Sequence, residues 1–259
     1  MTSWGANVGK SNIHTEAKSL YIYCINRLHM RTLGLIGGTS WLSTIDYYRI
    51  INSEINRRLG GINSASIYMY SMNFIELTPP TDESGWTRIG ERLQGIAHNL
   101  ERAGADCIMI CANTPHLVAD TVKAGITVPF IHIAEVTAEA ILRTDVRKVA
   151  LLGTKFTMER TFYTDKLSAA GITTIIPDDD ERMFIHNSIY NEMGKGIFSD
   201  ETKQTYLKII ARQIERGAEG IIFGCTEIPM LIRPEDCPVP SFDTTMIHAM
   251  AAVEFALGG

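Results

Sequence analysis

The chain has 259 residues, of which 45% are hydrophobic and 20% are charged, and its formal net charge is −5. This length is sufficient for one large domain or two smaller ones with buried cores. The mildly acidic balance argues against a general binder of nucleic acid or of anionic membranes, because both require clustered Lys and Arg. No apolar run approaches the ~18 residues of a membrane-spanning helix, so no membrane partner is expected.

The five cysteines form an odd number in a mid-sized chain without a convincing secretory signal. Such a pattern predicts reduced thiols and a cytoplasmic protein rather than a disulfide framework. Cys107 and Cys111 fall four residues apart on an expected strand, which places them ~13 Å from each other, too far to share a metal ion. No metal site is predicted.

Residues 1–29 differ from the rest of the chain, because they combine polar residues with a short apolar segment at 20–25. That segment is shorter than the apolar region of a usual signal peptide. We expect a disordered extension or an upstream start, with a docking or targeting segment as the alternative. Residues 5–11 imitate a P-loop, but three residues instead of four separate the glycines and no apolar strand precedes them.

From Met30 onward, short apolar runs alternate with amphipathic stretches. The apolar runs predict strands at 32–37, 65–71, 106–111, 128–132, 148–152, 173–176, 219–223 and 239–242. The amphipathic stretches predict helices at 43–59, 85–103, 115–124, 134–143, 157–169, 181–195, 200–216 and 244–256. Strands and helices that alternate in this way predict an α/β protein with mainly parallel sheets flanked by helices.

The sequence also repeats itself at offsets of 111 to 115 residues. Gly38-Thr39 returns as Gly153-Thr154, the segment 101–110 returns as 215–223, and Val128-Pro129 returns as Val239-Pro240. The repeat predicts two pseudosymmetric halves, one of 30–132 plus 245–259 and the other of 133–244. Because open α/β sheets bind ligands beyond the carboxyl ends of their strands, we expect the active site in the cleft between the halves.

The loops after the repeated strands carry the residues of greatest chemical interest. At an offset of 113, Ala112 falls opposite Cys225, Asn113 opposite Thr226, and Thr114 opposite Glu227. Cys111 precedes Ala112 by one residue, and neighbours on a strand point to opposite faces. We therefore expect Cys111 to point away from the side that Cys225 uses.

The chain from Met30 to the C-terminus resembles the aspartate/glutamate racemase superfamily, specifically its aspartate racemase-like branch. The resemblance rests on four segments: Gly34-Leu35-Ile36-Gly37-Gly38-Thr39-Ser40-Trp41, Asn113-Thr114-Pro115-His116, Leu151-Leu152-Gly153-Thr154-Lys155-Phe156-Thr157-Met158, and Phe223-Gly224-Cys225-Thr226-Glu227-Ile228. It implies an amino-acid racemase that needs no pyridoxal phosphate or other cofactor, takes a small-molecule substrate and forms a homodimer. Family members use two acid–base residues, usually two cysteines, with threonine replacing the first in some of them.

Thiols suit racemisation, because one base must take the α-proton on one face and an acid must return a proton on the other. A thiolate is a competent base, and neighbouring donors can lower the thiol pKa from about 8.5 toward neutrality. Cys225 is therefore the predicted catalytic cysteine, with an inert buried thiol as the alternative. Thr226 could donate to the thiolate or contact the substrate, and Glu227 could take the thiol proton or orient a partner.

The resemblance also implies substrate contacts. It assigns Asn113 and Thr114 to the α-carboxylate, with turn and N-cap chemistry as the alternative. Thr39 and Glu192 resemble substrate-facing positions, the latter near the distal end of the substrate. His116 is either a donor behind the site or an ordinary buried histidine. Trp86, with Arg88 and Arg92, is expected on a solvated helix edge.

Ala112 is the serious departure from the family pattern, because a methyl group cannot carry a proton. Three explanations stay open: an engineered change, a natural enzyme in which water or a neighbour serves the second face, or chemistry that needs only one side. Decarboxylases of the same superfamily use a single cysteine, but the sequence shows no apolar slot for a departing carboxylate. A non-catalytic amino-acid binder is the third class of function.

The preferred substrate is also open at this point. Aspartate and glutamate both require a partner for a second carboxylate, and the sequence offers Lys155, Arg49 and several threonines without indicating which one reaches it.

Overall fold

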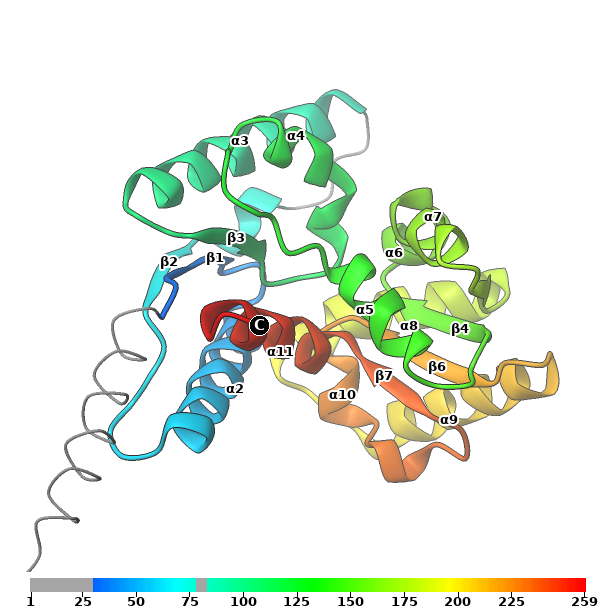
Figure 1. Cartoon of the computed structure of the whole chain (residues 1–259). Helices are drawn as coiled ribbons and strands as arrows, with labels where there is room; N and C mark the ends of the chain where they lie inside the picture. The colour runs from blue at the N-terminus through cyan, green and yellow to red at the C-terminus, as the bar shows by residue number, and fades with distance from the viewer. Residues whose placement is uncertain (1–29, 78–82) are drawn as a thin grey trace, which may run out of the picture.

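The computed structural model describes residues 30–77 and 83–259, so the predictions for residues 1–29 lie outside the described residues. The first half contains three strands and the helices that connect them (Figure 1). Its elements are β1 (Leu33–Gly37), α2 (Trp41–Leu59), β2 (Ile67–Ser71), the 3-10 helix η1 (Phe74–Leu77), α3 (Glu83–Arg102), β3 (Cys107–Ile110), the 3-10 helix η2 (Thr114–Val118) and α4 (Ala119–Lys123).

The second half begins with a helix and contains four strands. Its elements are α5 (Ile133–Leu142), β4 (Lys148–Gly153), α6 (Lys155–Glu159), α7 (Thr161–Ala169), β5 (Thr173–Ile175), α8 (Asp179–Asn191), the 3-10 helix η3 (Met193–Lys195), α9 (Asp200–Glu215), β6 (Gly220–Gly224), α10 (Ile228–Leu231), the 3-10 helix η4 (Pro234–Asp236) and β7 (Ser241–Asp243). The chain closes with α11 (Thr244–Ala256). None of the helices in this described part of the chain is long and apolar enough to cross a membrane.

The strands form two parallel sheets with the same order, β2-β1-β3 and β5-β4-β6-β7. Ile36 pairs with Ile110 in the first sheet, and Leu152 pairs with Phe223 in the second. Strands β3 and β6 hold corresponding places in the two sheets, and Ala112 and Cys225 lie in the loops that follow them. The predicted α/β fold with two similar halves is confirmed.

Buried side chains on both faces of each sheet account for the helices that cover them. In the first sheet, Leu35 packs toward α2 and α11, while Ile36 packs toward α3. In the second, Leu151 packs toward α5 and α7, and Leu152 packs toward α8 and α9. Strands that are buried on both faces are apolar throughout, which is why they stood out as continuous apolar runs in the sequence.

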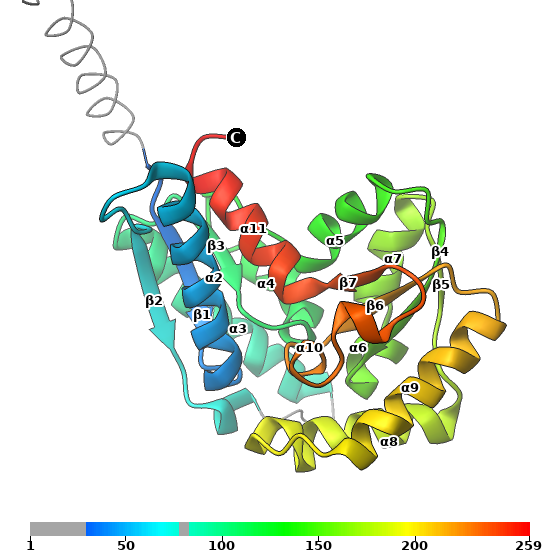
Figure 2. The same ribbon diagram turned by 90° about the horizontal axis from the view of Figure 1, so that it is seen from below.

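Two helices cross from one half to the other. Helix α5 leaves the first sheet and packs on the second, where Ile133 and Ile141 join the core around Val149. Helix α11 leaves β7 and packs on the first sheet, where Ala249 and Val253 join the core beside α2. Figure 2 shows α11 between α2 and α5, which it contacts on either side. This exchange supports a division into 30–132 plus 245–259 and 133–244, which stays a proposal.

Several predicted elements differ from the observed ones. The run 128–132 forms only a single parallel bridge, between Phe130 and Ile108, instead of a full strand. The expected helix 157–169 is two helices, because Arg160 adopts an extended backbone between them, and no Pro or Gly signals that break. Helix α8 ends at Asn191 and not at 195, and the expected helix 115–124 begins as the 3-10 helix η2.

Three buried histidines occupy the seam between the halves. The ring of His116 lies 4.8 Å from that of His132 and 5.6 Å from that of His248, between centroids. His248 on α11 bonds to the Tyr47 hydroxyl at 2.9 Å and to the Ile131 carbonyl at 2.9 Å. Burial lowers the pKa of all three rings, to about 4 for His132 and about 3 for His248. The seam therefore holds neutral rings at neutral pH.

The three buried histidines should make the folded protein less stable in acid. The unfolded chain binds protons at each ring as pH falls through about 6.5, while the folded chain does not until far lower pH. Between pH 7 and pH 5 the free energy of unfolding should fall by about 1–2 kcal/mol for each ring. Urea unfolding at the two pH values measures this. His248→Gln should reduce the pH dependence, whereas His98→Gln, at an exposed position on α3, should leave it unchanged; equal dependence in both variants would contradict the assignment.

Candidate active site

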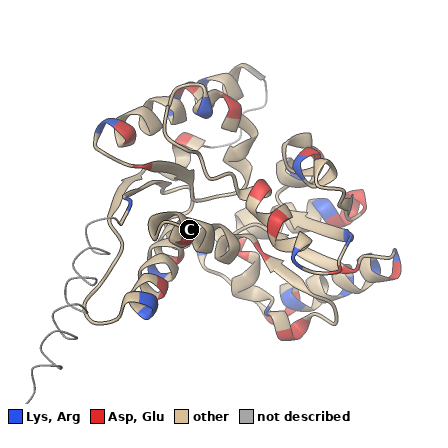
Figure 3. Ribbon diagram, in the orientation of Figure 1, with Lys and Arg blue, Asp and Glu red and all other residues tan. Residues whose placement is uncertain are grey.

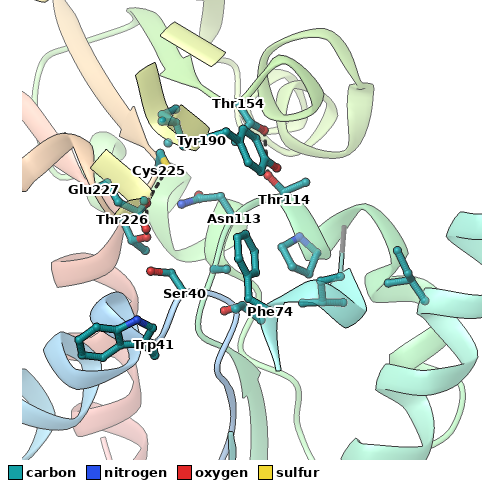
Figure 4. Close-up of a pocket in the computed structure, with 18 of the residues that line it drawn as sticks. Ser40, Trp41, Phe74, Asn113, Thr114, Thr154, Tyr190, Cys225, Thr226 and Glu227 are labelled. Carbon is teal, nitrogen blue, oxygen red and sulfur yellow. Dashed lines mark hydrogen bonds between the residues drawn. The ribbon is translucent and has the colours of Figure 1, made fainter. Parts of the chain in front are cut away.

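A pocket of about 260 Å³ opens where the carboxyl ends of the strands from both halves meet. The polar lining comes from the loops that follow β1, β3, β4 and β6, as the repeat predicted (Figure 4). The polar residues are Thr39, Ser40, Asn113, Thr114, Thr154, Cys225, Thr226 and Glu227, and Ala112 and Gly224 lie among them on the same strand ends. The apolar lining comes mainly from helices: Trp41, Phe74, Leu77, Trp86, Ile89, Pro115, Ile189 and Tyr190, with Gly194 and Lys195 beside them.

Cys225 directly follows β6, and its thiol donates a hydrogen bond to the Glu227 carboxylate. The distance from Cys225 Sγ to Glu227 Oε2 is 2.9 Å, and the Thr226 hydroxyl donates to the same oxygen at 2.7 Å. Glu227 precedes α10 without capping it through its side chain, so its carboxylate is available to both neighbours. The three consecutive residues thus form one hydrogen-bonded unit on the pocket wall.

The Cys225 thiol is protonated in this arrangement. Burial raises its pKa well above the usual value, the nearby Glu227 carboxylate raises it further, and the backbone N–H groups of Glu227 and Thr226 oppose the rise more weakly. The sequence predicted the opposite direction, because it revealed possible donors and not the depth of burial. Glu227 is consequently both the group that keeps the thiol protonated and the nearest acceptor for its proton.

Ala112 lies in the loop after β3 and lines the same pocket. Its carbonyl accepts a hydrogen bond from His116 Nδ1 at 2.8 Å, and His116 Nε2 accepts from the Ile133 backbone N–H at 3.3 Å. These two contacts fix the neutral tautomer with the proton on Nδ1. His116 does not line the pocket, so it holds the Ala112 loop from behind. Cys111 is fully buried on the other face, beside Tyr47, as strand alternation predicted.

Asn113 is oriented by Thr244, the first residue of α11. The Thr244 hydroxyl donates to the Phe223 carbonyl at 2.8 Å, so the same oxygen accepts from Asn113 Nδ2 at 3.0 Å. This network leaves Asn113 Oδ1 buried and without a hydrogen-bond partner in the described part of the chain. An unpartnered acceptor suits an N–H donor, such as a substrate ammonium, better than the carboxylate that the resemblance implied.

Three threonine hydroxyls meet on another side of the pocket. Thr114 lies 2.8 Å from Thr154 and 3.3 Å from Thr157, between Oγ1 atoms, and joins the two halves. Thr154 also caps α6 by accepting from the Thr157 backbone N–H. The Thr39 hydroxyl, by contrast, is committed to the Cys111 carbonyl at 3.2 Å. Thr114 and Thr154 therefore offer polar contacts from both halves.

Charged side chains are few among the described residues that line this pocket. Figure 3 shows Lys and Arg interspersed with Asp and Glu over the outer helices. Among the described residues that line the pocket, Lys195 is the one cation and Glu227 the one anion.

Comparison with known proteins identifies the family. A family model described as Asp/Glu/Hydantoin racemase matches residues 36–252, which is most of the chain. The chain belongs to this racemase family. Membership makes it an isomerase of the amino-acid racemase type, acting on a small molecule.

Solved structures and curated proteins agree with this family assignment. An Asp/Glu racemase candidate from Yersinia pestis is 44% identical, with a TM-score of 0.82, over 88% of this chain and all of that one. An aspartate racemase homologue from Pyrococcus horikoshii is 38% identical, with a TM-score of 0.75, over 88% of this chain and 99% of that one. The broad specificity amino-acid racemase of Bacillus subtilis is 25% identical over 61% of this chain and 67% of its own length.

Some predicted contacts of this racemase-family chain are not found in the pocket. Glu192 lies at the end of α8, where its carboxylate accepts from the Thr202 hydroxyl, and it does not line the pocket. Arg49 pairs with Asp46 on the exposed side of α2. Lys155 does not line the pocket either. The sequence does not indicate the direction in which these long polar side chains point.

Other pocket residues were missed by the sequence reading. Trp86 was expected on a solvated helix edge, but it is only 6% exposed and lines the pocket, because it packs against Phe156 of the other half. Ser40 presents its hydroxyl toward Thr226 in Figure 4. Lys195 follows α8 within a 3-10 turn. Ser40 belongs to the segment Gly34–Trp41 on which the family resemblance rests, but the resemblance pointed to its neighbour Thr39 as the substrate-facing residue.

The contact between Cys225 and Glu227 predicts that Glu227 controls the reactivity of the thiol. Glu227→Gln removes the charge that raises the Cys225 pKa, so the thiolate fraction at a given pH should increase, by about 10-fold for each unit of pKa. Iodoacetamide alkylation followed over pH, with peptide mass spectrometry to isolate Cys225, measures this shift. Glu235→Gln, on an exposed residue of η4, is the matched control. An unchanged or higher Cys225 pKa in Glu227→Gln would contradict the electrostatic assignment.

Proposed function

We propose that this chain catalyses abstraction and return of the α-proton of an amino acid without a cofactor, with Cys225 as one acid–base group. The observation that carries the proposal is that Cys225 and Ala112 follow corresponding strands of the two halves and line one pocket. An α-carbon bound between them has one face toward a thiol and the other toward a methyl group.

The reaction on the Cys225 side uses groups already in contact. Glu227 accepts the thiol proton, and the resulting thiolate removes the α-proton of the substrate. The electron pair of the C–H bond passes to the α-carbon and its carboxylate. The new S–H exchanges its hydrogen with solvent by way of Glu227, and the thiol then returns a solvent-derived proton to the same face. The backbone N–H groups of Thr226 and Glu227, which favour the thiolate, stabilise the intermediate state of the cysteine.

The Ala112 side has no side chain that can exchange a proton. Inversion therefore depends on a water molecule that donates a proton at that face, whereas exchange on the Cys225 face needs only that the thiol proton exchange with solvent by way of Glu227. Exchange of the α-proton should consequently be faster than racemisation. A natural enzyme with Ala112 would show this difference between the two rates. A protein in which Ala112 is an engineered replacement of a proton-carrying residue would show the same difference.

Substrate binding follows from the polar lining. We propose that the Asn113 side chain, which lines the pocket and whose Oδ1 has no hydrogen-bond partner in the described part of the chain, turns this oxygen toward the substrate ammonium. Thr114 supplies a hydroxyl within the same pocket for the α-carboxylate, while the Thr226 hydroxyl donates to Glu227. Aspartate and glutamate are the first substrates to test, because the similar structures include aspartate and glutamate racemases.

A single-cysteine decarboxylase of the same superfamily is the second candidate. The sequence showed no apolar slot for a departing carboxylate, but the pocket has an apolar wall that includes Leu77, Trp86 and Ile89. A decarboxylase would release CO₂ from a substituted malonate and leave the α-protons of amino acids untouched. Loss of both activities, with amino acids still bound, would indicate a non-catalytic binder.

Exchange in D₂O tests the proposed function. With L- and D-amino acids as substrates, NMR measures loss of the α-proton and chiral chromatography measures inversion. Loss of the α-proton of one enantiomer should be at least ~10-fold faster than inversion. Cys225→Ala should abolish exchange, since no other thiol lines the pocket within the described residues.

Ala112→Cys should raise inversion at least ~10-fold and bring it close to the rate of exchange, because a second thiol then serves the other face. Ala119→Cys, at a buried alanine of α4 outside the pocket, is the matched control and should not affect inversion. If Ala112→Cys leaves inversion unchanged while Cys225→Ala abolishes exchange, Ala112 does not occupy the position of the second base.

A further inference from the structure

A continuous chain of aromatic rings joins the two halves, and three of its members line the apolar wall of the pocket. We call it the aromatic belt, and its members in order are Phe74, Tyr190, His186, Phe156 and Trp86. The successive ring centroids are 6.5, 4.8, 6.0 and 5.4 Å apart. Phe74 and Tyr190 stack with an interplanar angle of 11°. Aromatic rings at such distances attract one another, so the belt is a coherent surface and not a set of unrelated side chains.

The belt members that line the pocket are Phe74, Trp86 and Tyr190, and aliphatic side chains extend the same surface. Leu77, Ile89 and Ile189 line the pocket beside them. In Figure 4, Phe74 lies across the pocket from Cys225, on the far side of Asn113. A substrate whose α-carbon lies beside Cys225 would therefore direct its side chain toward apolar atoms.

The charges of the pocket do not suit a second carboxylate. Glu227 is already hydrogen-bonded to Cys225 and Thr226, and its charge would repel another anion. Lys195 is the one described cation that lines the pocket, and it is exposed at the end of a 3-10 turn. Residues 78–82, which follow η1, contain no Lys or Arg. A carboxylate placed against the belt would lose water without gaining a buried partner.

A cationic side chain is disfavoured as well. Burial lowers the pKa of His186, and nearby Lys155 lowers it further, so the belt is uncharged at neutral pH and offers no anionic partner to a cation. Lys195 would repel a second cation. Removal of apolar surface from water is the favourable contribution that the wall can provide.

We propose that the substrate of this pocket is an α-amino acid with an uncharged, apolar side chain, aliphatic or aromatic, which packs against the aromatic belt. The proposal rests on the proposed α-proton chemistry at Cys225 and adds the class of side chain. Phe74, Trp86 and Tyr190 are the residues that set this specificity, and the polar residues at the strand ends bind the groups common to all amino acids.

A substrate panel tests the proposal. The kcat/KM for α-proton exchange in D₂O should be at least ~10-fold higher for leucine, methionine or phenylalanine than for aspartate, glutamate or lysine. NMR titration of Cys225→Ala with leucine and aspartate gives a readout of binding that does not require catalysis. Tighter binding and faster exchange of leucine are the expected results.

Variants of the wall sharpen the test. Phe74→Ala should lower kcat/KM for leucine and phenylalanine ~10-fold and change that for aspartate less. Ile75→Ala is the matched control, because Ile75 neighbours Phe74 in η1, is 71% exposed and does not line the pocket. Lys195→Met should increase the preference for leucine over aspartate, since it removes the cation and adds apolar surface.

The outcomes separate this proposal from the proposed function. If aspartate or glutamate is preferred ~10-fold and Lys195→Met abolishes that preference, the apolar-substrate proposal is overturned, while the α-proton chemistry stands. If the wild-type protein exchanges no α-proton of any amino acid in the panel, the proposed function fails. Binding of leucine to Cys225→Ala would then still support the specificity of the wall, and its absence would overturn that too.

Discussion

The exchange of α5 and α11 between the halves is the constraint on which the site depends. Each helix leaves one sheet and is buried on the other, so the relative position of the sheets is set by two apolar cores. The histidine seam lies at this crossing and links it to the pocket. His116 bonds both the Ala112 carbonyl and the first N–H of α5, while His248 connects α11 to the Ile131 carbonyl. Ala112 and Cys225 line one pocket because the histidine seam holds the two halves together.

Symmetric backbones at the two strand ends carry unequal chemistry. Cys225 has a carboxylate partner two residues later, whereas the equivalent loop places Thr114 at that position and directs its hydroxyl to Thr154. The two loops thus differ in charge as well as in the residue that faces the substrate. A thiol whose pKa is raised by burial and by Glu227 rests as an acid and becomes a base only when Glu227 takes its proton. Replacement of Ala112 alone would supply a second thiol but not a second carboxylate.

The sequence was most informative where one residue type or one period determines the outcome. Apolar runs identified the strands, because strands buried on both faces are apolar throughout. The repeat placed Ala112 opposite Cys225, and both residues line one pocket after corresponding strands of the two sheets. Local patterns failed where a distant contact decides. The extended backbone at Arg160 has no Pro or Gly to announce it, and the run 128–132 reads as a strand but forms one bridge.

The candidate site shows the same distinction. Cys225, Thr226 and Glu227 are consecutive, so their association was visible in the sequence. The direction of the Cys225 pKa was not, because burial depends on residues packed from other elements. Trp86 was placed on a solvated edge because its neighbours Arg88 and Arg92 are charged. Its burial against Phe156 requires the second half of the molecule, which no pattern within α3 describes.

Reactivity and side-chain recognition come from different parts of this fold. The groups that we propose to contact the α-carbon and its substituents lie on loops at the ends of β3 and β6, fixed by sheet register and by the seam. The belt comes from η1, α3, α6 and α8, which cover the sheets and can vary without disturbing that register. One charged substitution among the apolar wall residues would alter the side chain that is accepted while leaving Cys225 and Glu227 in contact. Members of one racemase family can therefore share a reaction and differ in substrate, and the wall is the feature of this chain that decides which amino acid it takes.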